Sequence, residues 1–513
     1  MNSKAHILSI IKKSGLFLFI FFFDLLSFSI LWAKMNYANI GFAEIVFHLN
    51  MPLEGTAGDL LYGYLMDALV PAVIFSLVIF FILTALWRRK YTLEAAVGRV
   101  QIKLNIKWSA AGFVCFSWLF LLYQAEQEFA VTQFVKNQVQ QSGFIQEEYV
   151  DPKSVEIRFP EKKRNLITLY VESAETTLQD RENGGIFDVN YIPEMTALAR
   201  ENISFSHSEL LEGAAVAPAS GWTIAALVAE TSGLPLKLFA YDEERADNTM
   251  EEYSYFLPGA TALGDILEEE GYKNYFMAGS KFEFGGRKSY FTQHGNYEIW
   301  DYNSAISEGK IAEDYKVHWG FEDQKLYEYA KEKLLELASG DQPFNFSLIT
   351  TDSHHPSGYV CQLCEETYSE QYANVWACTS KQLDEFIRWL KEQDFYENTT
   401  VVVLGDHCSM SKDLGLSEVV YDKHGGSTAR KVYNAFLNSP LEPVKEENRR
   451  FTTMDMFPTI LGSLGVRIEG NRLALGTNLF SKQETLAEEY GYEYLFDELN
   501  KKSLFYDEEL LYP

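Results

Sequence analysis

Three apolar runs in this chain end in, or lead shortly into, side chains that can bind a metal ion or transfer a proton. These are Glu172 after residues 165–171, His354 and His355 after residues 344–350, and Asp406 with His407 after residues 400–405. Such runs are typical of strands that are buried on both faces, as in a parallel sheet. In open α/β sheets ligands bind beyond the carboxyl ends of the strands, and carboxylates and imidazoles are suitable metal ligands. The pattern therefore predicts one shared site at that edge of a sheet.

A hydrolase or transferase built on these groups also needs a nucleophile, for which Thr223 is the candidate. Residues 224–230 are helix-forming, so Thr223 is expected at or beside a helix N-terminus, where backbone N–H groups and the helix dipole favour a phosphate. Coordination to a divalent metal would lower the pKa of its hydroxyl and supply the alkoxide. The alternative is an ordinary N-cap residue, and the company of Glu172 and the Asp406–His407 pair favours the nucleophile.

The remaining candidate is Arg287, in the sequence Phe-Gly-Gly-Arg-Lys, which could hold a phosphate or be a plain surface cation. Every other site residue has a similar structural alternative. The alternatives are a surface carboxylate for Glu172, a turn for Asp406 and His407, and loop histidines for His354 and His355. The shared site would be absent only if all of these alternatives were correct at the same time, so the shared site is favoured.

Three apolar runs near the N-terminus are candidates for transmembrane helices: Gly15–Ala33, Ala68–Trp87 and Trp108–Tyr123. The first two contain 19 and 20 residues, which is enough to cross hydrocarbon as a helix, and the third contains 16. The alternatives are a cleaved signal peptide for the first and a buried helix for the third. Lysines precede the first run and basic residues crowd the loop between the other two, which predicts that the N-terminus lies inside and that the chain from about residue 125 lies outside.

Charge is distributed unevenly along the chain. Residues 151–513 carry 33 Lys and Arg against 62 Asp and Glu. This excess of acidic residues argues against nucleic acid as a partner, although it does not indicate a reaction.

Cysteines cluster after the two histidines, at Cys361, Cys364 and Cys378, and another, Cys408, follows His407. A Cys-x-x-Cys pair can indicate zinc, but a second pair is missing and the expected compartment is oxidising. We therefore expect a disulfide rather than a zinc site, and assign it to Cys364 and Cys378.

From Lys162 to about residue 480, strand patterns alternate with helical patterns, which predicts an α/β fold with a mostly parallel sheet flanked by helices. Besides the three strands above, we expect a strand at Asn274–Ala278 and helices at Ala262–Glu270, Leu326–Ala338 and Ser380–Gln393. The predicted division is a transmembrane region at 1–125, a connector at 126–161, a catalytic domain at 162–480 and an acidic tail at 481–513.

From about Asn165 to Gly476, these candidates resemble, in their order and local context, the membrane-anchored, sulfatase-like branch of the alkaline phosphatase superfamily. This branch includes lipoteichoic acid synthases and phosphoglycerol transferases. The likeness is strongest to the transferases that decorate periplasmic glucans, in the motifs Phe47-His-Leu-Asn-Met-Pro-Leu, Thr223-Ile-Ala-Ala-Leu-Val-Ala and Asp352-Ser-His-His-Pro-Ser-Gly. The resemblance implies an alkaline-phosphatase-like fold behind a bundle of about three transmembrane helices.

The resemblance also implies roles for single residues. One divalent ion, commonly Mn²⁺ with Mg²⁺ or Zn²⁺ as alternatives, would be bound by Glu172, Thr223, Asp406 and His407. Thr223 would be the nucleophile and His354 would contact the transferred group or protonate a departing oxygen. Arg287 and His355 would bind substrate.

Some features depart from the family pattern. Gly285 and Gly286 precede Arg287 where the lipoteichoic acid synthases carry an aromatic residue, and those enzymes usually have five spans. The glucan transferases normally extend beyond the point where this chain ends, which leaves the acceptor open. The Cys/Ser-x-Pro-x-Arg motif of true sulfatases is missing around Thr223, so hydrolysis of sulfate esters is disfavoured.

The function implied is that of a multi-pass protein of the bacterial inner membrane with a periplasmic catalytic domain. It would transfer glycerophosphate from phosphatidylglycerol, through a covalent phosphothreonine, to a glycan-like acceptor. Phosphoethanolamine transfer or phosphodiester hydrolysis by the same site is the first alternative. A non-catalytic, membrane-tethered binding domain that keeps the fold is the second.

Overall fold

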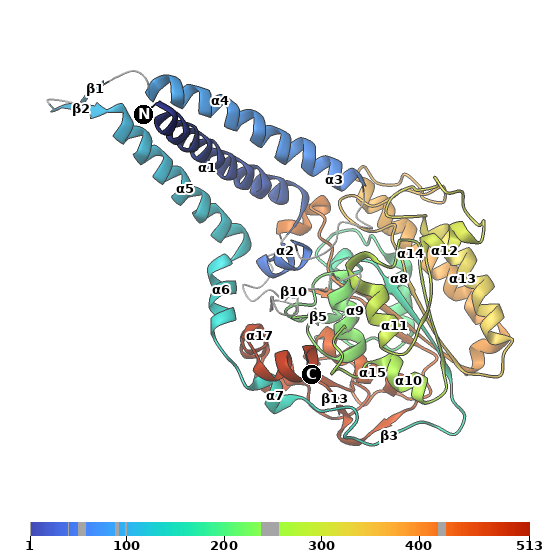
Figure 1. The fold of residues 1–513 in the computed structure, drawn as a ribbon. Helices are drawn as coiled ribbons and strands as arrows, with labels where there is room; N and C mark the ends of the chain where they lie inside the picture. The colour runs from blue at the N-terminus through green and yellow to red at the C-terminus, as the bar shows by residue number, and fades with distance from the viewer. Residues whose placement is uncertain are drawn as a thin grey trace. The chain divides into compact units, whose positions relative to one another are not determined.

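The computed structural model describes residues 2–38, 40–49, 58–87, 92–97, 100–237, 256–418 and 427–512. The chain divides into two compact units, whose elements are labelled in Figure 1. One unit combines Met1–Ile40 with Thr56–Thr132, and the other combines Gly41–Gly55 with Gln133–Pro513. All residues of the predicted site belong to the second unit.

Long helices dominate the first unit. Its elements are α1 (Asn2–Asn36), α3 (Gly58–Tyr64), the π-helix η1 (Leu65–Leu69), α4 (Val70–Trp87), the antiparallel pair β1 (Thr92–Val97) and β2 (Val100–Asn105), and α5 (Ile106–Phe129). Aromatic rings join α1 to α4, with the ring centres of Phe28 and Phe75 5.3 Å apart. The one acidic residue within the apolar part of α1, Asp24, accepts a hydrogen bond of 2.7 Å from Ser76 of α4. The buried carboxyl therefore has a polar partner inside the helix pair.

Two described helical segments are long and apolar enough to cross a membrane, Ile10–Asn36 and Leu60–Ala85. They contain the first predicted span and most of the second. The third predicted span, Trp108–Tyr123, lies in α5 but is not among them. Its apolar run of 16 residues is the shortest of the three, so the described residues hold two such segments and not the three expected.

A six-stranded sheet forms the centre of the second unit, with the order β11-β9-β4-β8-β6-β7. Its strands are β4 (Asn165–Val171), β6 (Lys273–Ala278), β7 (Glu298–Trp300), β8 (Phe344–Ile349), β9 (Thr399–Gly405) and β11 (Asn434–Leu437). All neighbours pair in parallel except β11, which is antiparallel to β9. The predicted α/β fold with a mostly parallel sheet is thus confirmed, including the expected strand at residues 274–278.

Helices cover both faces of this sheet. One face packs against α9 (Thr223–Ser232), α10 (Leu263–Glu269), α11 (Arg287–Gln293) and α15 (Met456–Ser463). The other packs against α8 (Pro193–Glu201), α12 (Tyr302–Ser307), α13 (Asp323–Ala338) and α14 (Gln371–Lys391). The predicted helices correspond to α10, α13 and α14, and α14 begins nine residues earlier than expected.

Shorter elements complete the unit. The helices are α2 (Phe42–Leu49), α6 (Val131–Val139), α7 (Phe144–Glu148), α16 (Leu486–Tyr490), α17 (Tyr492–Asn500) and the π-helix η9 (Tyr506–Leu511). The antiparallel pairs are β5 (Ala214–Val216) with β10 (Ser427–Val432), β3 (Ile157–Arg158) with β12 (Arg467–Ile468), and β13 (Arg472–Leu473) with β14 (Gly476–Thr477). The 3₁₀ turns are η2 (Thr176–Leu178), η3 (Arg181–Asn183), η4 (Phe284–Gly286), η5 (Asp394–Asn398), η6 (Asp413–Glu418), η7 (Thr453–Asp455) and η8 (Glu469–Asn471).

Candidate metal centre and nucleophile

The register of two neighbouring strands places three of the predicted ligands together. Val171, the last residue of β4, pairs with Gly405, the last residue of β9. Glu172 and the Asp406–His407 pair therefore leave the sheet side by side. One ligand atom from each of Glu172, Asp406 and His407 lies within 4.8 Å of the others, and all three residues are buried.

Hydrogen bonds orient these ligands. His407 Nδ1 lies 2.9 Å from the carbonyl oxygen of Cys408, which can only accept, so Nδ1 carries a hydrogen and Nε2 faces the carboxylates. Asp406 Oδ1 accepts from the backbone N–H groups of Ser173 and His407, both at 2.8 Å. Asp406 Oδ2 is buried and lacks a hydrogen-bond partner among the described residues. This oxygen is thus available to a cation.

The electrostatics of this cluster also favour binding of a cation. Burial and the nearby Glu172 raise the pKa of Asp406 to about 7. Burial would lower the pKa of His407, but Asp406 and Glu172 outweigh it and raise that pKa to about 10. Burial would raise the pKa of Glu172, whereas His407 and His354 hold it below its usual range. Two buried carboxylates around one imidazole need a proton or a metal ion between them. The carboxylate oxygens and the imidazole nitrogen are suitable ligands for a divalent ion.

Thr223 completes this arrangement. Its Oγ1 lies 3.4 Å from Glu172 Oε2 and 3.4 Å from His407 Nε2. It is the first residue of α9, while Trp222 occupies the N-cap position without a side-chain capping bond. The alternative of an ordinary N-cap is therefore wrong for Thr223. Its hydroxyl lies instead between two ligand side chains and beside the N-terminus of a helix, where a phosphate would be stabilised.

The two histidines after β8 lie next to each other, with ring centres 4.6 Å apart. His354 Nδ1 is 3.0 Å from the carbonyl oxygen of His355, so its Nε2 is left as an acceptor. Burial lowers the pKa of His354 to about 4, and the opposing effect of Glu172 is smaller. Burial also lowers the pKa of His355 well below its usual range. Both imidazoles are therefore neutral near pH 7 and suited to hydrogen bonding.

Arg287 begins α11, directly after two glycines in the left-handed region, Gly285 at φ 72° and Gly286 at φ 78°. Arg287 is 5% exposed, and its guanidinium donates to Ser280 Oγ at 3.1 Å and to the carbonyl oxygen of Lys281 at 2.7 Å. Burial lowers its pKa to about 10, against the attraction of Glu172, so it stays charged at neutral pH. The two glycines allow the turn that brings this cation toward the carboxylates.

An aromatic side chain also lies beside His354 in this region. The ring of Trp319 lies 4.2 Å from that of His354 and 5.3 Å from that of Phe284, measured between ring centres. His318 lies beside it, with Nε2 3.2 Å from the carbonyl oxygen of His354. Sequence reasoning missed both residues because the loop around them carries no motif.

Further buried polar residues hold the ligand-bearing loops in place. Ser173 Oγ donates to Glu172 Oε1 at 2.8 Å, and the Glu172 N–H donates to Thr350 Oγ1 at 3.0 Å. Arg430 forms a fully buried ion pair with Glu175, which also accepts from the N–H of Ser409 at 3.1 Å. This pair fixes the loop just after His407.

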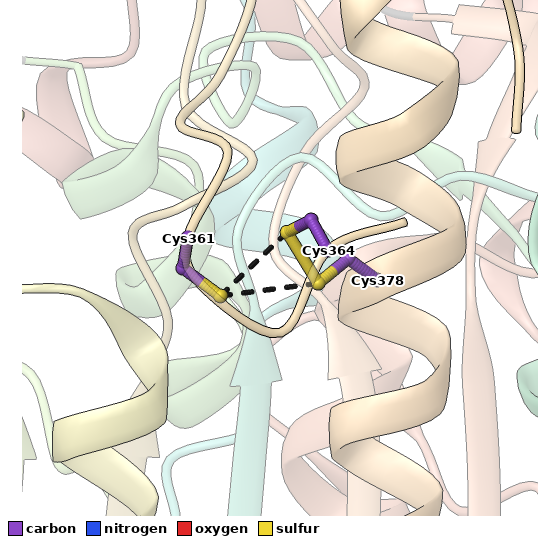
Figure 2. A group of neighbouring side chains, drawn as sticks. All are labelled: Cys361, Cys364 and Cys378. Atoms are coloured by element: carbon purple, nitrogen blue, oxygen red, sulfur yellow. Dashed lines mark hydrogen bonds between the residues drawn. A yellow bond between two sulfur atoms is a disulfide. The ribbon is translucent and has the colours of Figure 1, made fainter. Parts of the chain in front are cut away.

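The predicted disulfide between Cys364 and Cys378 is confirmed (Figure 2). Cys361 lies beside it, with Sγ 3.6 Å from that of Cys364 and 3.9 Å from that of Cys378. Only one of the three sulfurs is a thiol, so the cluster does not provide the set of thiolates that a structural zinc site requires. Cys408 is buried and is not part of a disulfide.

The chain is similar to known proteins. The family model and the curated relatives match only part of the chain, and the solved structures are similar at low identity. Residues 234–466 match the sulfatase family model. The chain is 29% identical over 317 residues to phosphoglycerol transferase I of Xanthomonas euvesicatoria pv. vesicatoria, covering 60% of this chain and 42% of that protein. It is 32% identical over 288 residues to phosphoglycerol transferase I of Escherichia coli O6:K15:H31, covering 55% of this chain and 35% of that protein. The chain thus matches less than half the length of these curated relatives.

Solved structures are similar to this chain at lower identity. The lipoteichoic acid synthase LtaP from Listeria monocytogenes is 18% identical, with a TM-score of 0.49 over 66% of this chain and 82% of that chain. The lipooligosaccharide phosphoethanolamine transferase EptA from Neisseria meningitidis is 14% identical, with a TM-score of 0.48 over 90% of this chain and 87% of that chain.

Proposed function

We propose that this chain is a membrane-anchored, metal-dependent phosphotransferase of the bacterial inner membrane. Its substrate would be the glycerophosphate headgroup of phosphatidylglycerol, which it would move to an extracytoplasmic, glycan-like acceptor. The observation that carries the proposal is the position of Thr223 Oγ1, 3.4 Å from both Glu172 and His407 at the first residue of a helix. The similarity to phosphoglycerol transferases supports the choice of headgroup.

Glu172, Asp406, His407 and Thr223 would hold one divalent ion, with Mn²⁺ as the expected metal. When bound, such an ion lowers the pKa of the threonine hydroxyl and offsets charge on the phosphoryl oxygens. Asp406 and His407 are kept in a fixed orientation for this by their bonds to Ser173 and Cys408. The remaining steps depend on the protein's own side chains.

Thr223 Oγ1 attacks the phosphorus, and the bond between the phosphorus and the diacylglycerol oxygen breaks. Diacylglycerol leaves as an alcohol, its oxygen taking up the proton that the Thr223 hydroxyl releases. The hydroxyl of Thr223 donates a hydrogen bond to Glu172, so its proton can leave along this contact as the bond to phosphorus forms. An acceptor hydroxyl then attacks the phosphothreonine and restores Thr223. Arg287 and the backbone N–H groups at the start of α9 stabilise the phosphoryl oxygens, and the neutral His354 and His355 bind the transferred group.

A lipid donor explains the two apolar helical segments, because anchoring confines the enzyme and its substrate to one surface. The basic residues between the second and third apolar runs favour an N-terminus inside and the site outside. This topology needs a third crossing, for which we propose the shorter apolar run of α5, Trp108–Tyr123.

The test is release of labelled diacylglycerol from phosphatidylglycerol vesicles by the purified full chain with Mn²⁺. Thr223→Ala should abolish release, and equal release by that variant would overturn the proposal. An excess of unlabelled phosphatidylethanolamine should leave release largely unchanged. Competition at equal strength would instead favour phosphoethanolamine transfer, and release of many diacylglycerol molecules per enzyme without any acceptor would favour simple hydrolysis.

A further inference from the structure

Helix α2, Phe42–Leu49, belongs to the same compact unit as the catalytic sheet although it lies more than 100 residues before it in the sequence. In the sequence α2 stands between the two apolar helices α1 and α4.

Phe47 is only 1% exposed and is part of the core on the α9 face of the sheet. Its ring centre lies 5.0 Å from that of Trp222, the residue directly before the nucleophile. Figure 1 shows α2 beside the part of the unit that carries α9, β5 and β10. The segment therefore packs against the start of α9.

Glu44 lies on the same side of α2 as Phe47, because residues three apart in a helix are neighbours on its surface. Its side chain is buried as well, at 7% exposure, and accepts a hydrogen bond from the backbone N–H of Gly41. Burial raises the pKa of Glu44 to about 8, and the positive charge of His407 opposes that rise. Glu44 is therefore buried on the face of α2 that packs Phe47 against Trp222, rather than on an outer surface.

Trp222 adds a second polar group at this interface. The residue is 6% exposed, and its indole Nε1 is buried without a hydrogen-bond partner in the described part of the chain. An indole N–H can only donate. A buried donor of this kind is costly to leave unsatisfied, so it marks a position where a ligand acceptor belongs.

We propose, on the basis of the function proposed above, that Glu44 and Trp222 recognise a hydroxyl of the glycerol headgroup. A hydroxyl both donates and accepts, so it can donate to the Glu44 carboxyl and accept from the Trp222 indole. The ammonium of ethanolamine has three donors and no acceptor, so it leaves the indole unsatisfied. Helix α2 thus contributes a specificity-determining wall to the site and selects a hydroxyl-bearing headgroup over an ammonium-bearing one.

The test compares kcat/KM for phosphatidylglycerol and phosphatidylethanolamine, taken from the first, single-turnover release of diacylglycerol by the full chain in vesicles of each lipid without any acceptor. Trp222→Phe removes the indole N–H but keeps a ring against Phe47, and Glu44→Ala removes the carboxyl. Each should lower kcat/KM for phosphatidylglycerol about tenfold, mainly through KM, which corresponds to one lost hydrogen bond. The kcat/KM for phosphatidylethanolamine should change less, so the preference for phosphatidylglycerol over phosphatidylethanolamine should become smaller.

Two further variants separate recognition from structure. Glu44→Gln keeps an acceptor and should stay within about threefold of the wild type. Leu49→Ala, at a residue of the same helix that is 79% exposed, should match the wild type on both lipids. The thermal midpoint of each variant shows whether the fold is retained.

Equal losses on both lipids in Glu44→Ala and Trp222→Phe would show a merely structural role and overturn the inference, as would unchanged kinetics. An effect that appears only when an acceptor glycan is added would overturn the assignment to the donor. If the wild type itself releases no diacylglycerol from phosphatidylglycerol, the proposed function fails and this inference with it. Failure of the inference alone requires an active wild type, so the two outcomes are distinguishable.

Discussion

The backbone N–H of Ser173 donates to Asp406 Oδ1 at 2.8 Å and so joins the ends of two strands that lie more than 230 residues apart in the sequence. The same oxygen accepts from the N–H of His407, while Oδ2 faces the cluster. One oxygen of the carboxylate thus holds the loops together, and the other is left for the proposed cation. This division allows metal binding to be changed without loss of the loop.

Asp406→Asn should remove the metal and keep the fold. Its side-chain oxygen can still accept from the two N–H groups, but an amide nitrogen then faces Glu172 and the cation. We expect metal content, measured by elemental mass spectrometry after gel filtration, to fall from about one ion per chain by at least tenfold. The exposed Asp188, which pairs with Arg181 at the surface, provides the matched control, and Asp188→Asn should retain metal. Full metal content in Asp406→Asn would contradict this assignment.

Thr223→Val should leave a correctly folded but inactive protein. Valine keeps the shape of threonine without its hydroxyl, so diacylglycerol release should fall by at least about a thousandfold. Intact-mass spectrometry after mixing with phosphatidylglycerol should show a glycerophosphate adduct on the wild type and on Thr223→Ser, but not on Thr223→Val. An adduct on the valine variant would place the nucleophile at another residue.

Loss of the disulfide should destabilise the loop that follows His355, and Cys361 should rescue part of the loss. Cys364→Ser opens a loop with a sequence separation of 14, for which chain entropy predicts about 3 kcal/mol. Cys361 Sγ lies 3.9 Å from Cys378 Sγ, so it can form a replacement bond in that variant. Chemical denaturation without reductant should therefore show a larger loss of stability for the Cys361→Ser, Cys364→Ser double variant than for Cys364→Ser alone. Equal losses would mean that no replacement bond forms.

His207 should make the protein sensitive to acid. Its ring packs on Phe451, Nδ1 lies 2.8 Å from the carbonyl oxygen of Gly213, and burial, with a smaller effect of Lys431, lowers its pKa to about 3. In the unfolded chain the pKa is about 6.5. Between these values the unfolded state binds a proton that the folded state does not, so stability falls as the pH decreases from about 6.5 to about 3.

The slope from this one group is at most about 1.4 kcal/mol per pH unit. In His207→Gln this contribution is absent, so the stability difference between the wild type and the variant should shrink as the pH falls. The measurement is the free energy of unfolding at a series of pH values from 7.5 to about 4. A difference that stays constant over this range would contradict the low pKa of His207.

Much of the site follows from local patterns. Each predicted ligand follows an apolar strand, and Thr223 begins a helix. The change between strand and helix periods along the chain is therefore enough to identify these residues as candidates. A disulfide in place of zinc was also predictable from the single Cys-x-x-Cys pair and the expected compartment, and the structure confirms the assigned pair, Cys364 and Cys378. The third apolar run shows the limit of such reasoning, because a run of 16 residues lies at the boundary between a span and an ordinary helix.

The sequence by itself determined which residues end the strands, since strand and helix periods are properties of neighbouring side chains. Only the tertiary structure decided that β4 lies between β8 and β9, which brings Glu172 beside Asp406 and near the histidines. It also decided that α2 packs Phe47 against Trp222 and that Trp319 lies on His354. These contacts join segments far apart in the chain, and they depend on which buried surfaces fit one another. Local propensity carries no information about that fit, because an apolar face is compatible with many partners until the whole core is packed.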